Sequence, residues 1–170
     1  MQPTFETPRL VLMPRALMDT EECLVMDRDP EVTRFVDGPW LEQEKHRAFV
    51  EARTLARYPP GMGYWTIRNR CHPSDFLGWV LLIPSDAIGP ETEIGWRLPR
   101  KAWGAGFATE AARPVLQHAF VTLQLPEVVA EIDALNLASI RVAEKLGLAR
   151  RGQVLKHGRA SLRYVLEAAS

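Results

Sequence analysis

The sequence has few of the features that mark secreted, membrane-bound or metal-binding proteins. Its 170 residues include only two cysteines, Cys23 and Cys71, which form neither a disulfide framework nor a recognisable metal-ligand spacing. No apolar stretch approaches the roughly 20 residues that cross a bilayer. The opening residues, MQPTFETPRL, lack the apolar segment of a signal peptide. We therefore expect a cytoplasmic protein with no metal and no membrane contact.

Excess charge is absent as well. The chain carries 21 Lys and Arg against 21 Asp and Glu, so its formal net charge is zero. This balance argues against a nucleic-acid partner, because proteins that bind nucleic acids present a basic surface to the phosphates. No internal repeat or low-complexity segment occurs, and 170 residues suit one domain with a sizeable core. The expected organisation is a single domain over residues 1–170.

Two common phosphate-binding motifs are missing. No G-x-x-x-x-G-K-[ST] occurs, which excludes a P-loop. Thr109 stands where the third glycine of G-x-G-x-x-G would follow Gly104 and Gly106. The chain has instead the stretch ETEIGWRLPRKAWGAGFATEAA over residues 91–112. This stretch reads as a strand ended by Pro99, a glycine turn and the start of an amphipathic helix.

The glycine turn predicts an anion site. The first N–H groups of a helix have no partner within the helix, and the helix dipole is positive there. Glycine lets the backbone approach a bulky phosphate closely. We therefore expect a diphosphate to lie on the backbone of the turn, with Lys101 supplying positive charge nearby. The residues expected to contact it are Trp103, Gly104, Ala105, Gly106, Phe107, Ala108 and Thr109.

Hydrophobic periodicity and turn residues divide the rest of the chain into alternating elements. Strands are expected at residues 7–13, 63–68, 76–83, 91–98, 128–133, 148–156 and 161–167. Helices are expected at residues 19–26, 42–58, 108–123 and 136–147, with a brief helix or turn at 31–36. Pro114 falls inside the 108–123 helix, where it removes a backbone hydrogen bond and should kink the helix. His46 and His118 are expected at the surface of their helices.

The glycine turn resembles that of the GNAT superfamily of N-acetyltransferases, in which the pattern [QRK]-x-x-G-x-G/A holds the diphosphate of acetyl-CoA. The stretches E-I-G-W-R-L-P and W-G-A-G-F-A-T-E-A-A and the opening E-T-P-R-L-V-L-x-P are especially similar to the RimJ/RimL-like branch. The resemblance covers nearly the whole chain. It implies an α+β fold, with a central, mostly antiparallel twisted sheet of six to seven strands flanked by helices. Paired monomers are common in such folds, so a homodimer is open.

A second motif, NLASIRVAEKLGL over residues 136–148, resembles the N-x-x-S-x-x-V-x-E-K-L-G-F of the same superfamily. The resemblance implies that Asn136 contacts the pantetheine arm or an ordered water, and that Ser139 lies near the thioester sulfur. The structural alternative for Asn136 is a helix N-cap. Many members have a tyrosine acid where this chain has Ala143, so Ser139 is the expected substitute. The pantetheine is expected to run beside Trp96, Arg97 and Leu98.

Acetyl transfer to an amine needs a base, because the amine must be neutral to attack and an α-amino group has a pKa of about 8. Our candidate is Glu93 on the predicted 91–98 strand, acting directly or through water, with Glu91 as the fallback. The alternative is an ion pair between Glu93 and Arg97, which share a strand face. Backbone N–H groups would stabilise the oxyanion if the strand bulges at Gly95.

The acceptor pocket is expected to use Phe35, Trp40 and Trp65, for which the alternative is core packing. The resulting hypothesis is an N-acetyltransferase that moves the acetyl group of acetyl-CoA, its co-substrate, to a primary amine. That amine would belong to a protein N-terminus or to a small molecule. The competing hypothesis is a non-catalytic acyl-CoA-binding regulatory domain.

Overall fold

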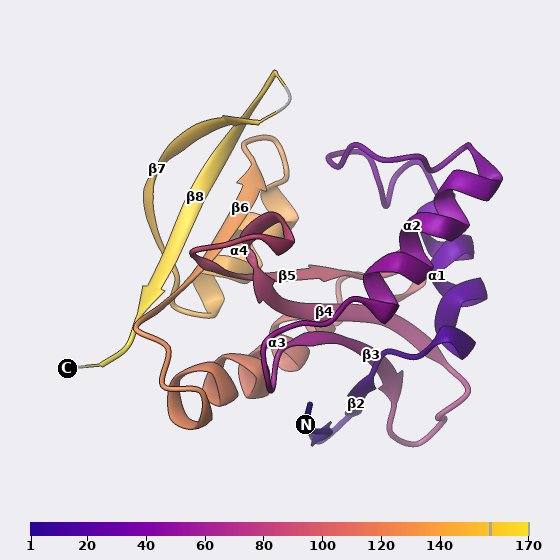
Figure 1. The fold of residues 1–170 in the computed structure, drawn as a ribbon, viewed down its shortest axis with the longest axis horizontal. Helices are drawn as coiled ribbons and strands as arrows, with labels where there is room; N and C mark the ends of the chain where they lie inside the picture. Colours follow the sequence, from indigo (N-terminus) through magenta and orange to yellow (C-terminus); the bar gives the residue numbers. More distant parts are fainter. Residues whose placement is uncertain (157, 170) are drawn as a thin grey trace.

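The computed structural model describes residues 1–156 and 158–169 and folds them around one mixed sheet (Figure 1). The strands are β1 (Phe5–Glu6), β2 (Leu10–Pro14), β3 (Gly63–Asn69), β4 (Phe76–Pro84), β5 (Thr92–Arg97), β6 (Glu127–Asp133), β7 (Ala149–Lys156) and β8 (Arg159–Glu167). The α-helices are α1 (Thr20–Asp27), α2 (Gln43–Leu55), α3 (Phe107–Gln117) and α4 (Leu137–Lys145). Short 3-10 turns lie at Leu17–Asp19, Ser85–Ala87 and Arg100–Ala102.

The eight strands lie in the order β1-β2-β3-β4-β5-β6-β8-β7. All neighbouring pairs are antiparallel except β5 and β6, which are parallel. The expected α+β class and mostly antiparallel sheet are therefore confirmed, with one strand more than the upper expectation of seven. The additional strand, β1, has two residues, which is too short for an alternating pattern to reveal it.

Helices cover both faces of the sheet (Figure 1). Because side chains alternate across a strand, Trp65 and Ile94 face the core that α3 closes, whereas Trp79 and Leu81 face the core beneath α1 and α2. Strand β4, with sequence FLGWVLLIP, is buried along nearly its whole length. A continuous apolar run of this kind is typical of a strand that is covered on both sides.

The sheet splits between β5 and β6. Strand β5 pairs with β4 at six positions, from Thr92 to Arg97. With β6 it is paired, in the described part of the chain, only at Glu93 opposite Val129. Figure 1 shows β6, β7 and β8 turned away from the β3–β5 strands. Helix α3 follows β5 and helix α4 follows β6, so both helices begin beyond the diverging ends of the two strands.

Two local expectations need correction. Helix α2 ends at Leu55 instead of residue 58, whereas residues 31–36 form turns, one of the two forms expected for them. Pro114 lies inside α3, and a π-helical segment, His118–Thr122, continues the helix. His46 is 0 % exposed and His118 is 7 % exposed, so the expectation that these side chains lie at the surface is wrong.

Candidate active site

The loop before α3 presents a row of free backbone donors. Gly104 and Gly106 have φ values of +75° and +81°, which L side chains rarely adopt. The Trp103 N–H donates to the Arg100 carbonyl (3.1 Å), and the Glu110 N–H donates to the Gly106 carbonyl (3.0 Å). Between them, the N–H groups of residues 104–109 have no acceptor in the part of the chain that the structure describes. These N–H groups surround a helix start, where a phosphate fits.

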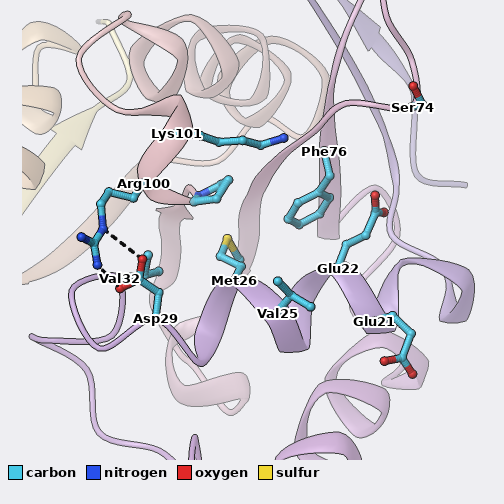
Figure 2. A pocket seen from close by; sticks show the side chains of 11 residues that line it. Glu21, Glu22, Val25, Met26, Asp29, Val32, Ser74, Phe76, Arg100 and Lys101 are labelled. Carbon is cyan, nitrogen blue, oxygen red and sulfur yellow. Dashed lines mark hydrogen bonds and ion pairs between the residues drawn. The ribbon is translucent and has the colours of Figure 1, made fainter.

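Two side chains assigned to this loop have protein partners. Lys101 forms an ion pair with Asp75 and lines a pocket of about 470 Å³ beside α1, shown in Figure 2. The Trp103 indole N–H donates to the Leu98 carbonyl at 2.8 Å, although 48 % of Trp103 is exposed. The positive charge expected from Lys101 is therefore already balanced by a carboxylate.

The edge of β5 beyond the split is open. From Ile94 to Arg97, β5 has a described strand partner on the β4 side only. Its other edge can therefore pair with an extended ligand arm as an added strand would. The register with β4 runs from Thr92 to Arg97 without a shift, so the bulge considered at Gly95 does not interrupt this pairing. Trp96 is partly buried against the α3 core.

The start of α4 has the capping geometry that the second motif suggested. The Asn136 Oδ1 accepts a hydrogen bond from the Ser139 N–H at 3.2 Å, which confirms the N-cap. Asn136 and Ser139 are both partly buried. Ala143 is 0 % exposed and packs in the α3 core, so a tyrosine at this position would have to displace its neighbours.

Glu93 lies on β5 at the point where β5 and β6 part. Burial raises the pKa of Glu93 to about 7; Lys156 and Arg53 act against this rise, whereas Glu131 and Asp86 add to it. Lys156, on β7, joins the two acidic neighbours, since its Nζ lies 3.0 Å from Glu131 Oε2 and 3.1 Å from Asp86 Oδ1. Glu93 thus lies within a cluster of mixed charge and is partly exposed.

The alternatives for the base are less suited to the role. Glu91 Oε1 accepts from Arg163 Nη2 at 2.9 Å, and hydrogen bonds from its own backbone N–H and from Arg163 lower its pKa. The structural alternative for Glu93, an ion pair with Arg97, does not occur among the described ion pairs, because Arg97 Nη1 pairs with Asp27 Oδ1 at 2.9 Å. Glu93 is therefore left without an arginine partner among the described ion pairs.

Sequence reasoning missed the network around Asp27. This carboxylate is 2 % exposed and pairs with Arg97 and with His46 Nε2, the latter at 3.1 Å. The Arg97 guanidinium lies 4.9 Å from the Trp40 ring and 5.0 Å from the Trp79 ring. The side chain of Arg97 therefore binds protein groups on the α1–α2 face, and only its backbone borders the open β5 edge.

The aromatic residues assigned to the acceptor pocket separate into two groups. Trp65 is 0 % exposed, and its indole N–H donates to the Pro3 carbonyl at 2.7 Å. It packs in the α3 core, which corrects its assignment to the acceptor pocket. Phe35 and Trp40 are partly exposed in the 28–42 connection. Arg159 on β8 reaches the same connection, with its Nη1 at 3.9 Å from Asp37 Oδ1.

The described residues contain neither a cluster of metal ligands nor a membrane-spanning helix. Over residues 1–156 and 158–169, no group of three or more His, Cys, Asp or Glu side chains is placed to hold a metal ion. None of the helices in these ranges has the length and apolar character that a membrane span requires.

Comparison with known proteins agrees with this geometry. The family described as acetyltransferase (GNAT) domain matches residues 9–149. The chain belongs to the GNAT acetyltransferase family. A curated relative, FsC-acetyl coenzyme A-N(2)-transacetylase of Aspergillus fumigatus, is 35 % identical over 156 residues. The match covers 86 % of this chain and 65 % of that protein, so this GNAT chain spans about two thirds of its relative's length.

Solved structures share the GNAT fold. The acetyltransferase from Agrobacterium tumefaciens has a TM-score of 0.78 and 26 % identity, over 98 % of this chain and 95 % of that one. RimL, a ribosomal-protein acetyltransferase solved in complex with coenzyme A, has a TM-score of 0.78 and 15 % identity, over 98 % of each chain. The prediction of a GNAT-type acyltransferase is therefore confirmed at the level of the family.

Proposed function

We propose that this chain transfers the acetyl group of acetyl-CoA to a primary amine of a protein N-terminus or of a small molecule. The observation that carries the proposal is the position of Glu93 where β5 and β6 part, together with its pKa of about 7. A general base works best when its pKa is near the working pH. Glu93 combines this property with a place beside the open β5 edge.

Acetyl-CoA fits the backbone features around the split. The N–H groups of residues 104–109 would bind its diphosphate. The open edge of β5, residues 94–97, would pair with the amides of the pantetheine arm. Asn136 uses its Oδ1 for the helix cap, which leaves its Nδ2 as a donor for the same arm. Support comes from the family match and from coenzyme A in the RimL complex.

In the proposed reaction, Glu93 accepts a proton from the acceptor ammonium, directly or through a water, and the neutral nitrogen attacks the thioester carbonyl carbon. A C–N bond forms, the C–S bond breaks and the nitrogen loses its second proton to solvent. Free N–H groups on the β5 edge would stabilise the oxyanion. The departing thiolate takes a proton from water, or from Ser139, which then regains a proton from solvent. A thiol pKa of about 8.5 makes the thiolate an adequate leaving group without a strong acid.

The acceptor would bind on the α1–α2 face, between the 28–42 connection and the β7–β8 hairpin. Arg159 of the hairpin contacts that connection through Asp37. Phe35 and Trp40 are partly exposed there and would contact the acceptor. The Aspergillus fumigatus relative is named for transfer to an N(2) position, which supports a nitrogen acceptor for this chain.

The test is Glu93→Gln, assayed over an amine panel by following free thiol release from acetyl-CoA. We expect kcat to fall about 100-fold or more, because general-base catalysis contributes at least that much, while the Kd for CoA stays within about twofold of wild type. The matched control is Glu144→Gln, an exposed carboxylate on α4. If the wild-type protein binds CoA but produces no free thiol from acetyl-CoA with any amine of the panel, the chain would instead be the acyl-CoA-binding regulatory domain.

A further inference from the structure

The guanidinium of Arg9, near the start of the chain, lies against the glycine loop. Arg9, just before β2, has its guanidinium 4.5 Å from the centre of the Phe107 ring. Its Nη2 is 3.6 Å from the position that a Cβ on Gly106 would occupy. No other heavy atom of the described residues, chain neighbours aside, lies within 4 Å of that position. Arg9 therefore lies beside Gly106 and Phe107, two residues of the loop whose N–H groups have no acceptor among the described residues.

Glu110 holds Arg9 in this orientation. The Arg9 Nε and Nη2 both lie 2.6 Å from Glu110 Oε2. Glu110 Oε1 accepts hydrogen bonds from the Arg9 backbone N–H at 3.0 Å and from the Thr7 hydroxyl at 2.6 Å. Burial alone would raise the pKa of Glu110, but the hydrogen bonds from Thr7 and Arg9 lower it overall. The carboxylate is thus charged at neutral pH.

One edge of the Arg9 guanidinium remains available. A guanidinium has five N–H donors, and Glu110 engages those at Nε and at one side of Nη2. The N–H groups of Nη1 have no acceptor within the described residues, and 48 % of the side chain is exposed. Arginine presents such donors in a planar fork that matches phosphate oxygens.

We propose that Arg9 is a phosphate-binding residue of this acetyltransferase, donating its free guanidinium edge to the diphosphate of the coenzyme. The inference rests on the proposed function, since it assumes that the coenzyme binds the 104–109 loop. The Glu110 carboxylate in the first turn of α3 would repel a diphosphate if it were unpaired. Arg9 neutralises this carboxylate and still offers the N–H groups of its Nη1 to a ligand.

The experiment compares Arg9→Ala with wild type by calorimetric titration with CoA and with dephospho-CoA, which keeps the diphosphate but lacks the 3′-phosphate. We expect Kd to rise about tenfold or more for both ligands, because a charge-assisted contact is lost. A second readout is the ratio of kcat/KM for acetyl-CoA to that for acetyl-pantetheine, which lacks the diphosphate. This ratio should fall about tenfold, and it is independent of the fraction of active protein.

The matched control is Arg47→Ala. Arg47 is a partly exposed arginine of α2, on the opposite face of the sheet, and pairs with Glu21 of α1 and Glu51 of α2. This substitution should change neither quantity. An unchanged Kd in Arg9→Ala, or a loss confined to CoA, would overturn the assignment to the diphosphate. Equal losses with acetyl-CoA and acetyl-pantetheine would also overturn it.

A conservative variant covers the case in which Arg9→Ala does not fold. Arg9→Lys keeps the charge but loses the planar fork, so its Kd for both ligands should rise by about threefold or more. If Arg9→Ala does not fold, and folded Arg9→Lys binds CoA and dephospho-CoA with the wild-type Kd, the proposal is overturned. The proposed function has a separate readout: it fails if no amine supports turnover, whereas the role of Arg9 fails on coenzyme affinity.

Discussion

The perturbed carboxyl of Glu93 should make the stability of this acetyltransferase depend on pH. A folded-state pKa of about 7, against an ordinary value of 4.5, means that ionisation costs more in the folded than in the unfolded state. The cost is absent well below pH 4.5, grows as the pH rises through that value, and levels off above pH 7. From these two pKa values, we expect Glu93 to lower the free energy of unfolding by about 1 kcal/mol at pH 5 and about 3 kcal/mol at pH 8.

Glu93→Gln removes the ionisation and should therefore stabilise the fold, mainly at alkaline pH. The assay is urea unfolding of wild type and variant at pH 5 and pH 8, without ligand, followed by circular dichroism. We expect the gain in unfolding free energy to be about 2 to 3 kcal/mol larger at pH 8 than at pH 5. Glu144→Gln, the exposed control, should change stability by less than about 0.5 kcal/mol at either pH.

The reasoning would be refuted by a Glu93→Gln effect that is the same at pH 5 and pH 8. Such a result would mean that the carboxyl titrates alike in the folded and unfolded chain. By contrast, a Glu93→Gln variant that is more stable than wild type but inactive would show that the Glu93 charge lowers stability and is kept because catalysis requires it.

Three further predictions follow from the described contacts. Lys156→Gln should move the acid limb of the kcat/KM profile to higher pH, because Lys156 holds the pKa of Glu93 down; a shift to lower pH would contradict this. Gly106→Ala should cost about 1 to 2 kcal/mol in urea unfolding and weaken CoA binding in calorimetry, since φ is +81°. Asp27→Asn should cost about 3 to 5 kcal/mol in the same unfolding assay, because it leaves the mostly buried Arg97 without its carboxylate partner.

Features that depend on nearby residues were predictable from the sequence. The positive φ values of Gly104 and Gly106 follow from a glycine turn that opens a helix. The cap by Asn136 needs only a donor three residues away, at Ser139. In each case the signal and its structural effect lie within one turn of the chain. The strand and helix order followed in the same way from local periodicity.

Features that depend on distant partners were not predictable. Arg97 and Asp27 are 70 residues apart, and Arg9 and Glu110 are 101 apart, so no local pattern pairs them. The alternation of β3 predicts that Trp65 and Thr66 face opposite sides of the sheet. It does not predict which of the two sides the helices bury more completely. Whether β5 bulges at Gly95 was open for a related reason, since its regular geometry depends on the pairing with β4.

The sparse pairing of β5 with β6 has a consequence for how the molecule opens. In the described part of the chain, the two blocks of sheet, β1–β5 and β6–β8, are joined by one bridging pair, Glu93 and Val129, so few main-chain hydrogen bonds hold them together. Local opening of a protein follows such seams, and slow deuterium uptake marks the segments that stay closed. A ligand arm that pairs with β5 along this seam would connect the two blocks, and we expect coenzyme to slow exchange most at those N–H groups of residues 94–97 that point away from β4.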